Sequence, residues 1–206
     1  MGFASGWWVT FGAPSLPPAQ SNDWWVPVAL GCLVCAWRPR AGAAVALGAP
    51  VGAFWLKLIR SPWAGLGWGV AMAATMVATG ALLDRIRGRT AAAVLVGVTG
   101  VDALALVATG SARLAFCALL LLAAALPSLL WGRLSTWPWA VLHGLLIWSG
   151  VHWSSLGVWA VLPALAPALV WVPARWGSRR GVPAVVLALL LLTAVFAWEL
   201  LRDPPF

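Results

Sequence analysis

Long apolar runs, separated by short segments that contain arginine, are the feature that most limits how this chain can fold. A helix that crosses the ~30 Å hydrocarbon core of a bilayer needs about 20 apolar residues. The candidate runs are Asp23–Trp37, Ala41–Ile59, Ala64–Leu83, Thr90–Gly110, Leu114–Trp131, Pro138–Trp153, Ser155–Arg175 and Pro183–Leu201. They predict an all-α fold, a polytopic transmembrane helix bundle of eight spans. The first and sixth runs are short enough to be interfacial or re-entrant segments, so the range is six to eight spans.

The composition excludes most other classes of protein. Of the 206 residues, 63% are apolar and 9% are charged, whereas a soluble domain carries roughly 25% charged residues. So few charges cannot cover a water-exposed surface, which excludes a soluble enzyme and a disordered chain. The three cysteines all lie in apolar runs, so no disulfide framework is expected. The net charge of +8 comes from bases between the runs, so the predicted partner is the lipid bilayer and no nucleic acid is expected.

The basic residues between the runs predict the orientation of the bundle. If the N-terminus lies outside, the cytoplasmic loops hold Arg38, Arg40, Arg85, Arg87, Arg89, Arg133, Arg175, Arg179 and Arg180, and the other side holds Lys57, Arg60, Arg113 and Arg202. Cytoplasmic loops carry an excess of Lys and Arg, so both termini are expected on the outer side. The high use of Ala, Arg, Gly, Trp and Pro suggests a GC-rich bacterial genome, and we expect a multi-pass protein of the bacterial inner membrane.

The 17 tryptophans are an independent test of the predicted boundaries. Indole prefers the headgroup level, where its ring is apolar and its N–H stays in water. Trp63 falls near a predicted outer end, and Trp131 and Trp139 fall near predicted inner ends. Residues 69–130 contain no tryptophan, so we expect these helices to be shielded by the other spans or by another membrane protein subunit.

The chain divides into two parts on this interpretation. Residues 1–22 form an extramembrane or interfacial segment, and residues 23–206 form a single transmembrane domain of four helical hairpins. The loops are too short to hold a soluble catalytic domain, so any chemistry occurs within the membrane or at its edge.

Asp102 is the clearest candidate for a functional residue. It lies twelve residues beyond Thr90, or roughly 18 Å along the fourth run if that run is helical. An ionisable residue at such depth is energetically costly, which indicates a binding site by default. Thr99 lies one turn before it, and Thr75 falls at the same depth on the antiparallel third run, where it could hydrogen-bond the carboxyl. The alternative is a protonated Asp102 that only joins helices.

Four other titratable residues are candidates for binding. Lys57, Glu199 and His152 end their runs near the outer side, and Lys57 and Glu199 could pair if the first and last hairpins are neighbours. The alternative is that these side chains simply extend from helix ends into the headgroup region. His143 lies roughly 8 Å inside the sixth run, where it is either a ligand or a hydrogen-bonded packing residue.

No metal or cofactor is expected. Both histidines lie on the sixth run, so they cannot supply axial ligands from facing helices to two haems. The only lysine ends a run, so it does not fit a retinal site. No Gly-rich phosphate loop and no zinc-protease motif is present.

The segment Gly97-Val-Thr-Gly100-Val-Asp102 resembles the GxGD region of intramembrane aspartyl peptidases. That resemblance implies a second carboxylate that shares a water with Asp102. Val101 stands where the family has a glycine, and the nearest other carboxylate, Asp84, lies at the inner end of the third run. The two carboxylates are about 18 Å apart in depth, so no catalytic residue is predicted.

Three functions remain compatible with the sequence. The first is a small transporter or membrane-embedded substrate-binding subunit that uses Asp102 in a bundle of helices kinked by proline. The prolines are Pro50, Pro127, Pro163 and Pro167. The second is a non-catalytic scaffold or assembly subunit of a larger cell-envelope complex, which contacts its partners through residues 69–130. The third is an intramembrane enzyme, which we expect least because no acid and base share one depth.

Overall fold

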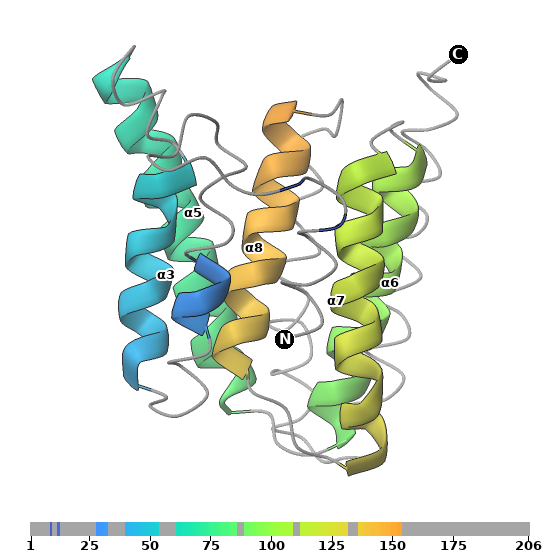
Figure 1. The fold of residues 1–206 in the computed structure, drawn as a ribbon. Helices are drawn as coiled ribbons and strands as arrows, with labels where there is room; N and C mark the ends of the chain where they lie inside the picture. The colour runs from blue at the N-terminus through green and yellow to red at the C-terminus, as the bar shows by residue number, and fades with distance from the viewer. Residues whose placement is uncertain are drawn as a thin grey trace. The chain divides into compact units, whose positions relative to one another are not determined.

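The computed structural model describes residues 9, 12, 28–32, 40–53, 61–85, 89–108, 112–131 and 136–153. Within these ranges the chain forms helices and no strand (Figure 1). The helices with defined bounds are α3 (Arg40–Ala53), α5 (Pro62–Leu83), α6 (Arg89–Ala108), α7 (Ala112–Trp131) and α8 (Thr136–Trp153). The all-α prediction is therefore confirmed for this part of the chain.

Helices α5 to α8 coincide with predicted runs to within two residues at each end. The start of α5 shows why proline marks a helix boundary. Pro62 is the first residue of this helix, and the N–H group that proline lacks would have no partner within the first helical turn. The N–H of Gly65 then donates to the carbonyl of Ser61 at 2.9 Å, which closes the first turn. Helix α3 covers the first part of run 41–59. Runs 155–175 and 183–201 lie outside the described residues, as does run 23–37 apart from residues 28–32.

Two prolines lie inside described helices without ending them. Helix α3 continues through Pro50 and α7 continues through Pro127. Pro127 has no N–H to donate to the carbonyl four residues earlier, so one bond of the α7 ladder is missing. Next to it, the hydroxyl of Ser128 donates to the carbonyl of Ala125. Pro163 and Pro167 lie outside the described residues.

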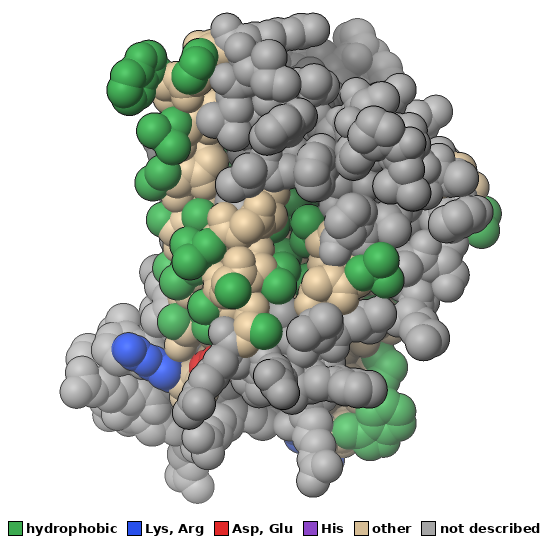
Figure 2. Space-filling model, turned by 60° about the vertical axis from the view of Figure 1, so that its left-hand side comes forward, with side chains coloured by type: hydrophobic (Ala, Val, Ile, Leu, Met, Phe, Trp, Pro, Cys, Tyr) green, Lys and Arg blue, Asp and Glu red, His purple; other side chains and the backbone are tan. Residues whose placement is uncertain are grey.

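Two helical segments are long and apolar enough to cross a membrane, Pro62–Ala81 and Leu114–Trp131. Helix α6 contains a shorter apolar stretch, Leu95–Leu104. Both candidate spans expose large apolar side chains, such as Val70 on α5 and Leu119 on α7, and Figure 2 shows apolar side chains gathered on the surface of the described part. Among the described residues only these two segments qualify as spans, so the eight-span bundle is not confirmed.

The chain forms two compact units, residues 1–80 with 135–145 and residues 81–134 with 146–206. In the first unit, glycines give the helices close contacts. A Cβ added at Gly42 of α3 would lie 2.5 Å from Cβ and Cγ of Trp137, and one added at Gly80 of α5 would lie 2.6 Å from Cε3 of the same indole. Likewise, a Cβ at Gly144 would lie 2.7 Å from Cγ of Met76. Trp137 therefore packs directly on the backbones of α3 and α5.

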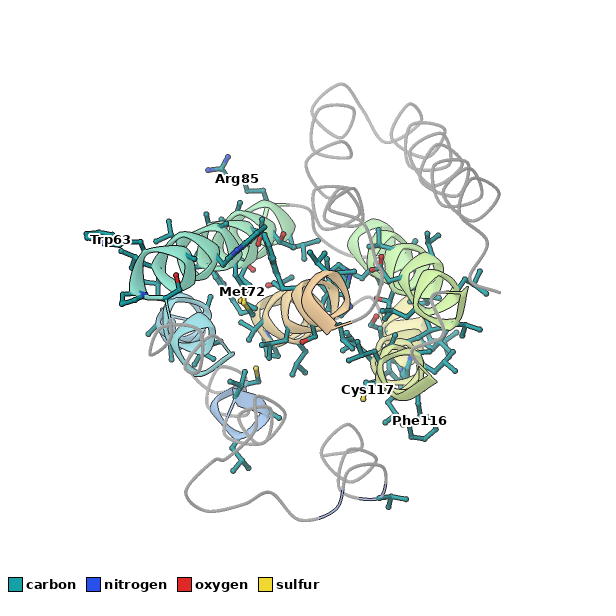
Figure 3. The ribbon with its side chains drawn as sticks, turned by 90° about the horizontal axis from the view of Figure 1, so that it is seen from above. Trp63, Met72, Arg85, Phe116 and Cys117 are labelled. Atoms are coloured by element: carbon teal, nitrogen blue, oxygen red, sulfur yellow. The ribbon has the colours of Figure 1, made fainter. Side chains whose placement is uncertain are left out.

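In the second unit, α6 and α7 pack side by side (Figures 1 and 3). The two 20-residue helices are each about 30 Å long, whereas three residues of chain can reach at most about 10 Å. The helices are therefore antiparallel. Their buried faces follow the helical period. Among the side chains that the structure describes, the buried ones of α6 are Ala92, Leu95, Val98, Thr99, Asp102, Ala103 and Leu106, and those of α7 are Leu114, Ala115, Cys117, Ala118, Leu121, Ala125 and Ser128.

Candidate functional site

Asp102 lies on the buried face of α6, where it is 2% exposed. It is thirteen residues beyond Arg89, the first residue of the helix, or about 20 Å along the axis. Leu95, Val98 and Leu106 share this face and are fully buried. A carboxyl group is thus buried well along α6, on a helix face whose other side chains are almost all apolar. Its role in a binding site stays a prediction.

Thr99 lies one turn before Asp102 on the same buried face, so their Cβ atoms are about 5–6 Å apart. The hydroxyl of Thr99 donates to the carbonyl of Leu95 at 2.7 Å. Because its hydrogen is directed to that carbonyl, the Thr99 oxygen can act only as an acceptor toward other groups. Asp102 and Thr99 together present acceptor oxygens on one face, a set that suits a cation, a proton or a ligand with N–H or O–H donors.

Helix α7 faces this part of α6 with small side chains. Asp102 lies six residues before the end of α6, and Ala118 lies six residues after the start of α7, so the antiparallel pairing brings them to one level. Ala118 and its neighbour Cys117 are completely buried. From residue 114 to its end, α7 contains no acidic, basic or amide side chain. The buried side chains of α7 at this level are therefore small and uncharged.

Thr75 is half-buried on α5, and its hydroxyl donates to the carbonyl of Met72 at 2.8 Å. It belongs to the first compact unit and Asp102 to the second, so the hydrogen bond expected between them stays a prediction. One turn later on the same helix, Thr79 is buried. The sequence hypothesis did not single out Thr79, although its spacing of four residues from Thr75 was the available signal.

His143 is 1% exposed and stacks on the indole of Trp139, with ring centroids 4.2 Å apart and an angle of 14° between the planes. The two residues are four apart, so they lie on one side of α8. Residues 139–150 of this helix are all buried. Trp139 is itself only 3% exposed, whereas the sequence predicted an indole at the headgroup level with its N–H in water. The stacking accounts for His143 as a packing residue and leaves its role as a ligand a prediction.

The remaining candidates are not brought together by the described part of the structure. His152 falls in the last turn of α8, but its side chain is outside the described residues, as are Lys57 and Glu199. Asp84 is exposed just after α5, whereas Asp102 is buried. These opposite environments do not resemble a carboxylate pair that shares one water.

No group of three or more His, Cys, Asp or Glu side chains that could hold a metal ion occurs among the described residues. The buried polar side chains there also include Ser128 and Ser149, which the sequence hypothesis did not identify because single serines in apolar runs carry no distinctive spacing. No family model, curated protein or solved structure matches the chain.

Proposed function

We propose that this chain is an integral membrane protein of a bacterial inner membrane, a bundle of eight helical spans with both termini on the outer side. The two apolar segments of α5 and α7 support membrane insertion. The exposed apolar side chains of both helices support it too, because a large apolar surface is stable against lipid and not against water. The excess of arginine in alternate loops supports the orientation.

Within this bundle, we propose that Asp102 binds the group that the protein transports or presents, so that the chain is a small transporter or a membrane-embedded substrate-binding subunit. The observation that carries the proposal is the position of Asp102, 2% exposed on the α6 face that also holds Thr99. A charged carboxylate is costly in such surroundings unless a counter-charge or proton accompanies it. A carboxyl group in such surroundings can bind a cation, a proton or a ligand that bears N–H or O–H donors.

The proposal is tested by comparing Asp102→Asn with Asp84→Asn. Both variants remove one carboxylate, but Asp84 is exposed and outside the candidate site. Purified protein is screened by thermal stabilisation with Na⁺, K⁺, Mg²⁺ and methylammonium, and proton flux is followed in liposomes loaded with a pH-sensitive dye. We expect Asp102→Asn to lower the affinity or flux by roughly tenfold or more, as for loss of a hydrogen bond to a charged group. Equal responses of the two variants would refute the role of Asp102.

A second candidate function is a scaffold or assembly subunit of a larger envelope complex. The observation that favours it is the outer face of α5, where Ala74 and Ala78 are exposed one turn apart. Small residues at this spacing let another membrane helix approach closely. Purification in mild detergent distinguishes the candidates, because a scaffold would retain a partner protein and a self-sufficient transporter would elute as one species.

A further inference from the structure

Exposed basic and aromatic side chains lie at one end of the α6–α7 pair. Arg89 begins α6 and Trp131 ends α7, and the antiparallel arrangement brings these two residues to the same end. Arg85 precedes Arg89 by four residues, so it lies within about 14 Å of it along the chain. All three residues belong to the second compact unit. We call Arg85, Arg89, Leu130 and Trp131 the basic end of this unit.

The side chains of the basic end are open to the surroundings. Arg85 and Arg89 are exposed, and Arg85 extends away from the helices (Figure 3). Leu130 and Trp131 are 73% and 74% exposed. Large apolar groups and guanidinium groups are therefore presented together.

The charge at this end is strongly asymmetric. The segment 84–89 contains Asp84 and three arginines, and Arg133 follows α7 by two residues, which gives four positive charges and one negative charge, a net +3. The opposite end of the pair, residues 108–113, contains only Arg113. The two ends of one helical hairpin thus differ by two units of charge.

We propose that the basic end binds the headgroups of anionic phospholipids in the cytoplasmic leaflet. Guanidinium groups form paired hydrogen bonds with phosphate oxygens. The Trp131 ring would lie at the level of the lipid glycerol groups, with its N–H in water and Leu130 beside it toward the acyl chains. Anionic lipids attract basic segments next to membrane helices, which matches the net +3 of this end.

A lipid headgroup fits these residues better than a free phosphate ion. Exposed arginines alone hold a small anion weakly, because solvent and salt screen the attraction. A bilayer supplies the phosphate at high local concentration and also covers Leu130 and Trp131, which a free ion does not. The inference rests on the membrane placement proposed above, but not on any role of Asp102.

The test is a titration of the detergent-purified chain with phosphatidylglycerol and with phosphatidylcholine, followed by native mass spectrometry. The variants are Arg85→Gln with Arg89→Gln, and Arg113→Gln as a control that removes one charge from the opposite end. We expect the wild type to prefer phosphatidylglycerol. We expect the double variant to lose affinity for it by about 25-fold, about fivefold for each arginine, and the control to keep it. High salt should weaken the wild-type preference.

Two results would overturn the proposal: equal affinity of the wild type for the two lipids, or an equal loss in Arg113→Gln and the double variant. Arg85→Lys with Arg89→Lys keeps the charge but removes the paired hydrogen bonds of the guanidinium groups, so it should lose part of the affinity for phosphatidylglycerol. It replaces the glutamine variant if that variant does not fold, and unchanged affinity would then contradict the proposal. Extraction of membranes with alkaline carbonate separates this inference from the proposed function. A chain released by carbonate contradicts membrane insertion itself, whereas a retained chain without lipid preference contradicts only the basic end.

Discussion

The contact between Gly42 and Trp137 allows a sharp test of how the first unit is packed. In Gly42→Ala, the new methyl group would lie 2.5 Å from Cβ and Cγ of Trp137. Ordinary contacts between carbon atoms are about 3.5–4.0 Å, so the overlap is about 1 Å. A change of rotamer moves Cγ but leaves Cβ in place, because Cβ is fixed by the backbone. Relief therefore requires that α3 move away from the N-terminal part of α8.

The control is Gly48→Ala on the same helix, where nothing lies within 4 Å of the added Cβ. Replacing glycine by alanine inside a helix stabilises it by about 0.5–1 kcal/mol. Overpacking costs about 1–3 kcal/mol. We therefore expect Gly48→Ala to stabilise the protein. The gain from replacing glycine by alanine is about the same in both variants, so the difference between them reflects the overlap alone, and Gly42→Ala should be less stable than Gly48→Ala by about 1–3 kcal/mol.

The free energy of unfolding is measured in detergent by titration with SDS, with the helical circular dichroism signal as readout. Trp137→Ala provides a second check, because in that background the difference between the Gly42 and Gly48 variants should shrink toward zero. If Gly42→Ala is as stable as Gly48→Ala in the wild-type background, the indole does not lie against α3 as described and the reasoning is refuted.

Three further predictions follow from the second unit. Leu95→Ala removes a fully buried side chain and should destabilise the protein by about 2–5 kcal/mol, whereas the exposed Leu104→Ala should cost far less; equal losses in SDS titration would contradict the assigned faces of α6. Thr99→Val removes the acceptor oxygen beside Asp102 at nearly constant shape, so the cation affinity should fall by roughly tenfold while helicity is kept, and unchanged affinity would exclude Thr99 from the site. Cys117, completely buried, should react with N-ethylmaleimide only after unfolding when the other two cysteines are replaced by alanine, and rapid labelling of the folded chain would contradict its burial.

The positions of helices α5 to α8 were predictable because charge and proline mark their ends. Pro62 begins α5 and Arg89 begins α6, so the boundaries are readable without knowledge of any tertiary contact. The faces of these helices were not predictable. Leu95 is buried and Leu104 is exposed on one helix, although both are leucine. In a helix that is apolar all round, composition does not distinguish a side that meets protein from a side that meets lipid.

Only those features of the candidate site that a local sequence pattern marks could be predicted. Asp102 is identifiable because it is an acid inside an apolar run, and its neighbour Thr99 follows from helical spacing. The stacking of Trp139 on His143 was not foreseen, because indole was expected at the headgroup level and not in contact with another ring. The contact of Trp137 with Gly42 joins residues that are 95 positions apart, and no local sequence pattern predicts such a contact.

The dependence of the first unit on Trp137 has a consequence for synthesis of the chain. Gly80 precedes Trp137 by 57 residues, so a ribosome needs roughly 3–11 s between them at 5–20 residues per second. During this delay α3 and α5 have left the ribosome, but the indole that packs against both does not yet exist. The α6–α7 pair, with three residues between its helices, can close as soon as α7 emerges. Helices α3 and α5 are therefore synthesised before the α6–α7 pair but complete their packing after it. In the interval, the surfaces around Gly42 and Gly80 are open to insertion factors or proteases.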